Sequence, residues 1–186
     1  IKGALTGSAM LTSPLADKGI LIDMICDSTH IADIPLGTVS IGSRLNEEKG
    51  GFDIALINEI EGRSSIALNG NLSLKQRHID TEATLNRFSI GYVQPFLTDV
   101  FSRMSGEMSG KINITGDFDN LDLYSEGTVL EESELTVAYT NVPYFVKGSF
   151  HVDSKGVYFD DISLRDRYTG TGAVTGSINW DNFRDF

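Results

Sequence analysis

The sequence predicts an all-β fold with one helix. In the stretch 142–152, V-P-Y-F-V-K-G-S-F-H-V, the even-numbered positions are apolar except for Gly148, and the odd-numbered positions from Phe145 onward are mostly polar. Such alternation with a period of two is typical of a β-strand with one apolar face. Further alternating stretches follow one another along the chain, separated by turn residues about every ten positions, which is the pattern of an all-β domain.

A glycine interrupts the apolar face of five of the predicted strands. The pattern apolar-x-Gly-x-apolar-x-apolar occurs around Gly7, Gly70, Gly110, Gly148 and Gly176. Glycine inside a strand usually marks a bend, a bulge or a close approach of another group. The alternative is chance, because the chain has 19 glycines in 186 residues.

The first half of the chain contains only predicted strands and turns. Polar and glycine-containing segments such as Asp17-Lys18-Gly19 and Asn46–Gly51 predict the turns between them. The predicted strands are 2–11, 20–26, 38–45, 52–60, 65–74 and 79–88.

The helix is predicted near Val93–Met104. Its apolar residues stand at offsets 0, 3, 4, 7, 8 and 11, which places them on one helical face. Pro95 is compatible with the first turn of a helix, and Ser105-Gly106 predicts its end. We expect the helix to separate two β halves, 1–90 and 106–186, of a single domain that is a fragment of a longer chain. The face that we expect to dock on the sheet consists of Phe96, Leu97, Val100 and Phe101.

Strands resume after the helix. Between Phe159 and Ile162 the apolar positions shift by one across Asp160-Asp161, which indicates a bulge or a break. The predicted strands are 106–116, 121–130, 135–139, 142–152, 156–164 and 172–180.

The composition excludes several classes of function. The formal net charge is −11, which argues against nucleic-acid binding and against adsorption to an anionic bilayer through a basic patch. The single cysteine, Cys26, excludes a disulfide framework. The three histidines lack partners at metal-ligand spacing, and adjacent acids such as Asp160-Asp161 point to opposite faces of a regular strand. We therefore expect no enzymatic activity, no metal and no cofactor.

The C-terminal half resembles a known family. The segments E-L-T-V-A-Y-T-N-V-P-Y-F-V-K-G-S-F-H-V from Glu134 and Y-F-D-D-I-S-L-R-D-R-Y-T-G-T-G-A-V-T-G-S-I-N-W-D-N-F-R-D-F from Tyr158 look like the C-terminal region of the TamB family. That family is the inner-membrane subunit of the translocation and assembly module, within the AsmA-like group. The segment S-G-E-M-S-G-K-I-N-I-T-G at 105–116 is similar to the same family, and the resemblance is best over residues 88–186.

The resemblance implies a curled, elongated β-sheet with an apolar inner face, a groove, in the periplasm of a two-membrane bacterium. It implies an inner-membrane anchor outside this fragment, and functions in phospholipid transport between the two membranes and in outer-membrane protein assembly. The implied partners are phospholipid acyl chains and an outer-membrane protein of the Omp85 type. The family offers no catalytic residue to carry over.

The alternating pattern selects the residues that would line such a groove. The candidate lining residues are Leu68, Leu72, Leu74, Met108, Ile112, Ile114, Tyr144, Val146, Phe150, Val152, Val174, Ile178 and Trp180. An ordinary β-sandwich with a filled core, used for adhesion or protein binding, is the alternative, because an amphipathic sheet can also bury its apolar face against a second sheet.

Overall fold

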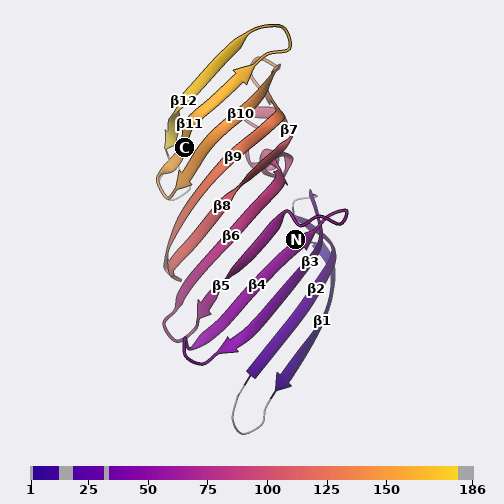
Figure 1. The fold of residues 1–186 in the computed structure, drawn as a ribbon, viewed down its shortest axis with the longest axis vertical. Coiled ribbons are helices and arrows are strands. Elements are labelled where there is room, and N and C mark those ends of the chain that lie inside the picture. The colour runs from indigo at the N-terminus through magenta and orange to yellow at the C-terminus, as the bar shows by residue number, and fades with distance from the viewer. Residues whose placement is uncertain (1, 13–18, 32–33, 180–186) are drawn as a thin grey trace. The chain divides into compact units, whose positions relative to one another are not determined.

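The computed structural model describes residues 2–12, 19–31 and 34–179, and almost all of them lie in antiparallel strands or the turns between them (Figure 1). The strands correspond closely to the alternating stretches of the sequence. They are β1 (Lys2–Thr12), β2 (Gly19–Ile31), β3 (Ile34–Asn46), β4 (Gly51–Glu59), β5 (Ile66–Ser73), β6 (His78–Ser89), β7 (Phe101–Ser105), β8 (Glu107–Asp117), β9 (Asn120–Val137), β10 (Val142–Asp153), β11 (Gly156–Arg165) and β12 (Thr171–Asn179).

The strands form one open sheet rather than two stacked sheets. The hydrogen-bonded order is β1-β2-β3-β4-β5-β6-β8-β9-β10-β11-β12, so nearly every strand pairs with its neighbour in the sequence. Strand β7 is the exception, because it pairs with β9 beside the path. The prediction of an all-β single sheet is confirmed, and the described residues contain no second sheet of the kind that a β-sandwich requires.

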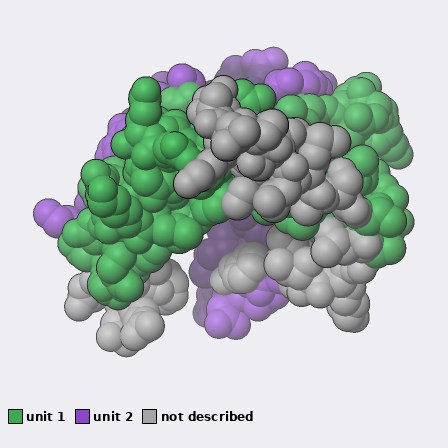
Figure 2. All heavy atoms as spheres, turned by 90° about the horizontal axis from the view of Figure 1, so that it is seen from below, with its two compact units in different colours: residues 1–84, 113–122 green, residues 85–112, 123–186 purple. Residues whose placement is uncertain are grey.

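The chain packs as two compact units, which Figure 2 shows in different colours. Unit 1 comprises residues 1–84 and 113–122, and unit 2 comprises residues 85–112 and 123–186. The tip of the β8–β9 hairpin therefore belongs to unit 1, whereas the remainder of both strands belongs to unit 2.

The predicted helix at 93–104 is wrong. The chain instead forms a short 3-10 helix, η1 (Ile90–Phe96), then a turn, then strand β7. Pro95 lies inside η1 and has no N–H to donate to a longer helix. Strand β9 extends beyond the start of β8, and its last residues, Glu134–Val137, pair with β7. Pairing with the edge of β9 thus stabilises a strand in this stretch, although its apolar residues are spaced as in a helix.

The predicted helix-docking face is consequently also wrong. Leu97 lies in the connection after η1 and Val100 in the turn before β7, and both are exposed. Phe101 begins β7 opposite Val137. The position of Phe96 is at the end of η1.

Strand β9 is a single strand of 18 residues where the sequence predicts two, at 121–130 and 135–139. The two parts are joined by a bulge between the pairs Val146–Ser133 and Gly148–Val129. Glu132 has a positive φ of 69° there. The predicted irregularity at Asp160-Asp161 is confirmed, since the registers of β11 with β10 and with β12 both shift there.

Few side chains are fully buried. The buried hydrophobic residues are Val39, Ala83, Leu85, Ile90, Met104, Val146 and Ile162. A sandwich would enclose most of its apolar face between two layers. Here most apolar side chains in the strands are only half-buried, so part of their surface remains open to solvent.

Candidate functional site

One face of the sheet in unit 1 is apolar. Residues directly opposite one another on neighbouring antiparallel strands place their side chains on the same face. The registers give continuous rows across β3, β4 and β5: Ile41, Leu56 and Leu68 form one row, and Leu45, Phe52 and Leu72 form another.

The same relation holds in unit 2. The register places Val152 of β10 opposite Val157 of β11, and Val157 opposite Ile178 of β12. A second row runs from Val129 through Gly148 and Ile162 to Val174. We call the face that carries these rows in each unit the apolar face of that unit.

Most of the candidate lining residues lie on these faces. The registers place Leu68 and Leu72 on the apolar face of unit 1, and Tyr144, Val146, Phe150, Val152, Val174 and Ile178 on that of unit 2. Met108, Ile112 and Ile114 share one face of β8 by alternation and are half-buried, whereas Lys111 and Thr115 are exposed.

Two candidates fall elsewhere. Leu74 follows the end of β5, in the turn to β6, and 56 % of its surface is exposed, so its place on a strand face is wrong. The turn residues Leu74–Arg77 end the strand one residue earlier than the apolar alternation suggests. Trp180 lies outside the described residues.

The ring of Phe150 in unit 2 lies against bare backbone. Phe150 is opposite Gly127 on β9 and opposite Phe159 on β11. A Cβ atom placed on Gly127 would stand 2.7 Å from Cζ of Phe150, so the ring lies directly over this glycine. Gly110 and Gly176 also belong to this part of the face. Glycines therefore leave the surface beside the two rings flat and without side chains.

Gly148 has a different role on the same face. Its φ of 140° is one that residues with a side chain rarely adopt, and a Cβ atom there would overlap the backbone carbonyl of Asp161. The bulge at Asp160-Asp161 lies beside it on β11. Gly148 thus permits the close strand approach at the point where β11 carries its extra residue.

Asn58 and Ser133 are buried polar side chains on the apolar faces. Asn58 on β4 lies opposite Val39, and its amide bonds the segment before β5: Oδ1 accepts from the backbone N–H groups of Ser65 (3.1 Å) and Ile66 (2.6 Å). In unit 2, Ser133 Oγ accepts from Glu107 N at 3.1 Å and donates to Glu107 O at 3.2 Å. Both residues were missed as sites from the sequence, because polar residues at apolar positions give no signal about their partners.

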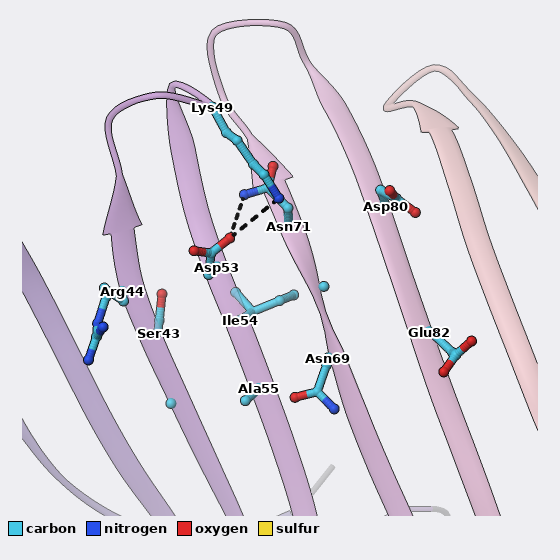
Figure 3. A pocket seen from close by; sticks show the side chains of 12 residues that line it. Ser43, Arg44, Lys49, Asp53, Ile54, Ala55, Asn69, Asn71, Asp80 and Glu82 are labelled. Carbon is cyan, nitrogen blue, oxygen red and sulfur yellow. Dashed lines mark hydrogen bonds and ion pairs between the residues drawn. The ribbon is translucent and has the colours of Figure 1, made fainter.

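The opposite face of unit 1 carries a shallow polar hollow of about 590 Å³ (Figure 3). Arg44 lies on one side of it, Asp80 and Glu82 lie on the other, and Lys49 extends toward Asp53 and Asn71 from the turn between β3 and β4. Asp53 in the middle accepts hydrogen bonds from Asn46 (2.9 Å) and Asn71 (3.1 Å). These bonds hold the pKa of the Asp53 carboxyl below its usual value. The hollow is wide and is lined by both acidic and basic side chains, and Asp53 is held by its two hydrogen bonds.

The opposite face of unit 2 carries a stack of rings. His151 stacks on Tyr158 with a centroid separation of 4.5 Å, and its Nδ1 lies 3.0 Å from Asp160 Oδ2. Tyr124 lies 6.4 Å away on the neighbouring strand. His151 stands on the polar face of its strand, as expected, and its hydrogen-bond partner is the displaced carboxylate of the bulge.

Neither polar face assembles reactive groups. Within the part of the chain that the structure describes, no three His, Cys, Asp or Glu side chains stand close enough to share a metal ion. The same residues include no helix that is long and apolar enough to cross a bilayer. What the arrangement offers chemically is an extended apolar surface with a polar reverse side.

Comparisons with family models, with curated proteins and with solved structures gave no match to this chain.

Proposed function

We propose that the apolar faces of this chain bind phospholipid acyl chains. The chain would act as part of a TamB-like protein of the periplasm that supports phospholipid transport between inner and outer membranes and the assembly of outer-membrane proteins. The protein that carries it would be anchored in the inner membrane by a segment outside this chain and would meet an Omp85-type partner at the outer membrane. The resemblance of residues 88–186 to the TamB family motivates the cellular setting.

The observation that carries the proposal is the apolar face that each unit presents on a one-layer sheet. Most side chains in its rows are half-buried or exposed, although Ile162 is buried, so apolar surface stays in contact with solvent. Water-exposed apolar area is favourable to cover, at about 25 cal/mol per Å². An acyl chain has no hydrogen-bonding groups and would fit a face on which glycines alternate with aliphatic and aromatic side chains.

Phe150 provides the test, because it is central to the apolar face of unit 2. A photo-crosslinking residue at position 150 should capture phospholipid in cells of a two-membrane bacterium. The same residue at Ser149, which is exposed on the reverse face of β10, is the matched control and should capture none. Crosslinks to protein alone from position 150 would favour a protein-binding module, the alternative function.

A second experiment measures transport rather than proximity. Phe150→Arg places a charge on the apolar face, and a charge is a barrier to an acyl chain. The variant should lower phospholipid movement while the protein remains present at its normal level. Lys147→Arg, on the exposed face of the same strand, is the control. Equal transport by both variants would contradict the proposal.

A further inference from the structure

Three neighbouring connectors at one end of the sheet of unit 2 expose aromatic or aliphatic side chains. The turn 138–141 between β9 and β10 exposes 97 % of Tyr139, and the loop 166–170 between β11 and β12 exposes 91 % of Tyr168. The connection from η1 to β7 exposes 36 % of Leu97 and 46 % of Val100. We call these four residues the tyrosine end.

Hydrogen bonds place the three connectors side by side. The backbone N–H of Ala138 donates to the carbonyl of Val100 at 2.9 Å, which joins the turn 138–141 to the connection from η1 to β7. Arg167, in the loop 166–170, donates to Glu134 of β9 at 3.1 Å. The two tyrosine turns are thus separated by about two strand spacings, roughly 10 Å.

Hydrogen bonds within each turn order the backbone that carries the tyrosines. Asp166 Oδ1 accepts from the backbone N–H groups of Tyr168 and Gly170, both at 2.8 Å. In the other turn, Asn141 has a φ of 53° and donates its N–H to Val137 O at 2.8 Å. A side chain on an ordered turn loses less conformational freedom on binding than one on a loose loop. Both tyrosines are therefore held outward by the backbone and not tucked against the sheet.

The charges at this end are balanced and largely engaged within the unit. Three acids, Asp99, Glu134 and Asp166, accompany three basic residues, Arg103, Arg165 and Arg167. The guanidinium of Arg165 lies 4.8 Å from the Phe145 ring centre, and Arg167 and Asp166 have the partners named above. The whole chain carries −11. An anionic bilayer surface would repel that net charge, but the tyrosine end itself is neutral in formal charge.

We propose that the tyrosine end docks on a lipid–water interface. Tyrosine has an apolar ring and a polar hydroxyl, and it is enriched where a membrane meets water. The four side chains of the tyrosine end project from ordered turns at the ends of neighbouring strands. This arrangement would let them contact a flat surface together. At the opposite end of the β10–β11 pair, the turn consists of Ser154 and Lys155, so this end of the unit differs in chemistry from the other. Docking would use aromatic and aliphatic tips instead of a basic patch.

The test is co-sedimentation of the 186-residue chain with vesicles of phosphatidylethanolamine and phosphatidylglycerol. The double variant Tyr139→Ser/Tyr168→Ser should lower the partition coefficient by about tenfold, because interfacial binding scales with the apolar area that enters the interface. The matched control is Tyr124→Ser, which removes another exposed tyrosine of unit 2 from a strand face. It should bind vesicles as the unaltered chain does. Circular dichroism should show that all three proteins are folded.

The location of contact is tested separately with Tyr168→Trp and Tyr124→Trp, each made with Trp180→Phe. Brominated phospholipid should quench the tryptophan at position 168 and not the one at 124. Vesicle binding by the double variant at the level of the unaltered chain would overturn the proposal, as would absence of binding by the unaltered chain. Self-association that disappears in the double variant, without vesicle binding, would assign the tyrosine end to a second copy and also overturn it.

The docking proposal does not rest on acyl-chain binding by the apolar face. A soluble short-chain phospholipid, used below its micelle concentration, measures that binding without any bilayer. If Tyr139→Ser/Tyr168→Ser binds this lipid normally but has lost vesicles, the tyrosine end alone is responsible. If the short-chain lipid fails to bind while vesicles still do, the proposed function fails and the docking proposal stands.

Discussion

At the scale of single residues, glycine and asparagine positions determine what the apolar faces can do. The sequence marks Gly148, because it interrupts an alternating pattern, but it does not mark Gly127. Nor does it reveal their different roles: Gly127 lies beneath the ring of Phe150, whereas Gly148 permits the approach of a neighbouring backbone. That difference depends on cross-strand register, which no local pattern contains.

Gly148→Ala should destabilise the protein by about 3–5 kcal/mol, because the new Cβ atom combines backbone strain with overlap of the Asp161 carbonyl. Gly176→Ala is the matched control. Gly176 has a similar φ of 148°, but a Cβ atom there would meet nothing within 4 Å. Its loss should be nearer 1 kcal/mol. Urea unfolding of both variants measures the difference, and equal losses would show that the overlap at Gly148 is relieved by small shifts.

Asp53 should make stability depend on acid pH. The hydrogen bonds from Asn46 and Asn71 lower the pKa of its carboxyl in the folded chain relative to about 3.9 in the unfolded chain. The stabilisation is therefore complete above about pH 4 and is lost as pH falls through the folded pKa. Melting temperatures from pH 6 downward should show Asp53→Asn less stable than the unaltered chain, with the difference shrinking on acidification. A constant difference would contradict the assignment.

At the scale of elements, the strands were predictable and the helix was not. The sequence located every strand except β7, although it divided β9 into two. In Val93–Met104 the helical spacing of apolar residues was real, but the last residues of the 18-residue strand β9 pair with β7 at the end of this stretch. Tertiary pairing of this kind overrides local periodicity. The bulge at Asp160-Asp161 was predictable from the sequence, because the apolar positions shift there by one residue.

Gln94 should hold η1 to β7. Its side-chain amide donates to Ser102 O at 3.0 Å and accepts from Met104 N at 3.2 Å, so it occupies the edge of β7 where a further strand would pair. Gln94→Ala should remove about 1 kcal/mol of local stability, and the Met104 amide should exchange about fivefold faster. Hydrogen exchange measures this directly. Gln76→Ala, in the β5–β6 turn, should leave Met104 unaffected.

At the scale of the whole chain, net charge and a largely half-buried apolar surface act together. The formal net charge is −11, and mutual repulsion of like charges weakens a folded protein. The composition predicted this acidity and excluded nucleic acid as a partner. It could not distinguish an uncovered apolar face from a filled sandwich, because both have the same alternation.

Salt that screens the repulsion between the negative charges should therefore stabilise the protein. Raising sodium chloride from about 0.02 M to about 0.3 M shortens the Debye length from about 20 Å to under 10 Å. We expect the melting temperature to rise by a few degrees. A chain with three exposed glutamates changed to glutamine, Glu47, Glu48 and Glu61, should start higher and respond less to salt. A melting temperature that falls with salt would show that attractive pairs such as Lys147–Glu131 dominate.

The sequential strand order has a consequence for how the chain reaches its structure. Each strand apart from β7 pairs with the strand just before or after it along the path, so most pairing partners are separated by a single hairpin. The entropy lost in closing such short loops is small. The sheet can then form one hairpin at a time during synthesis, because each new strand pairs with the edge strand that was formed before it. Only β7 must wait, because its partner, β9, is completed some thirty residues later.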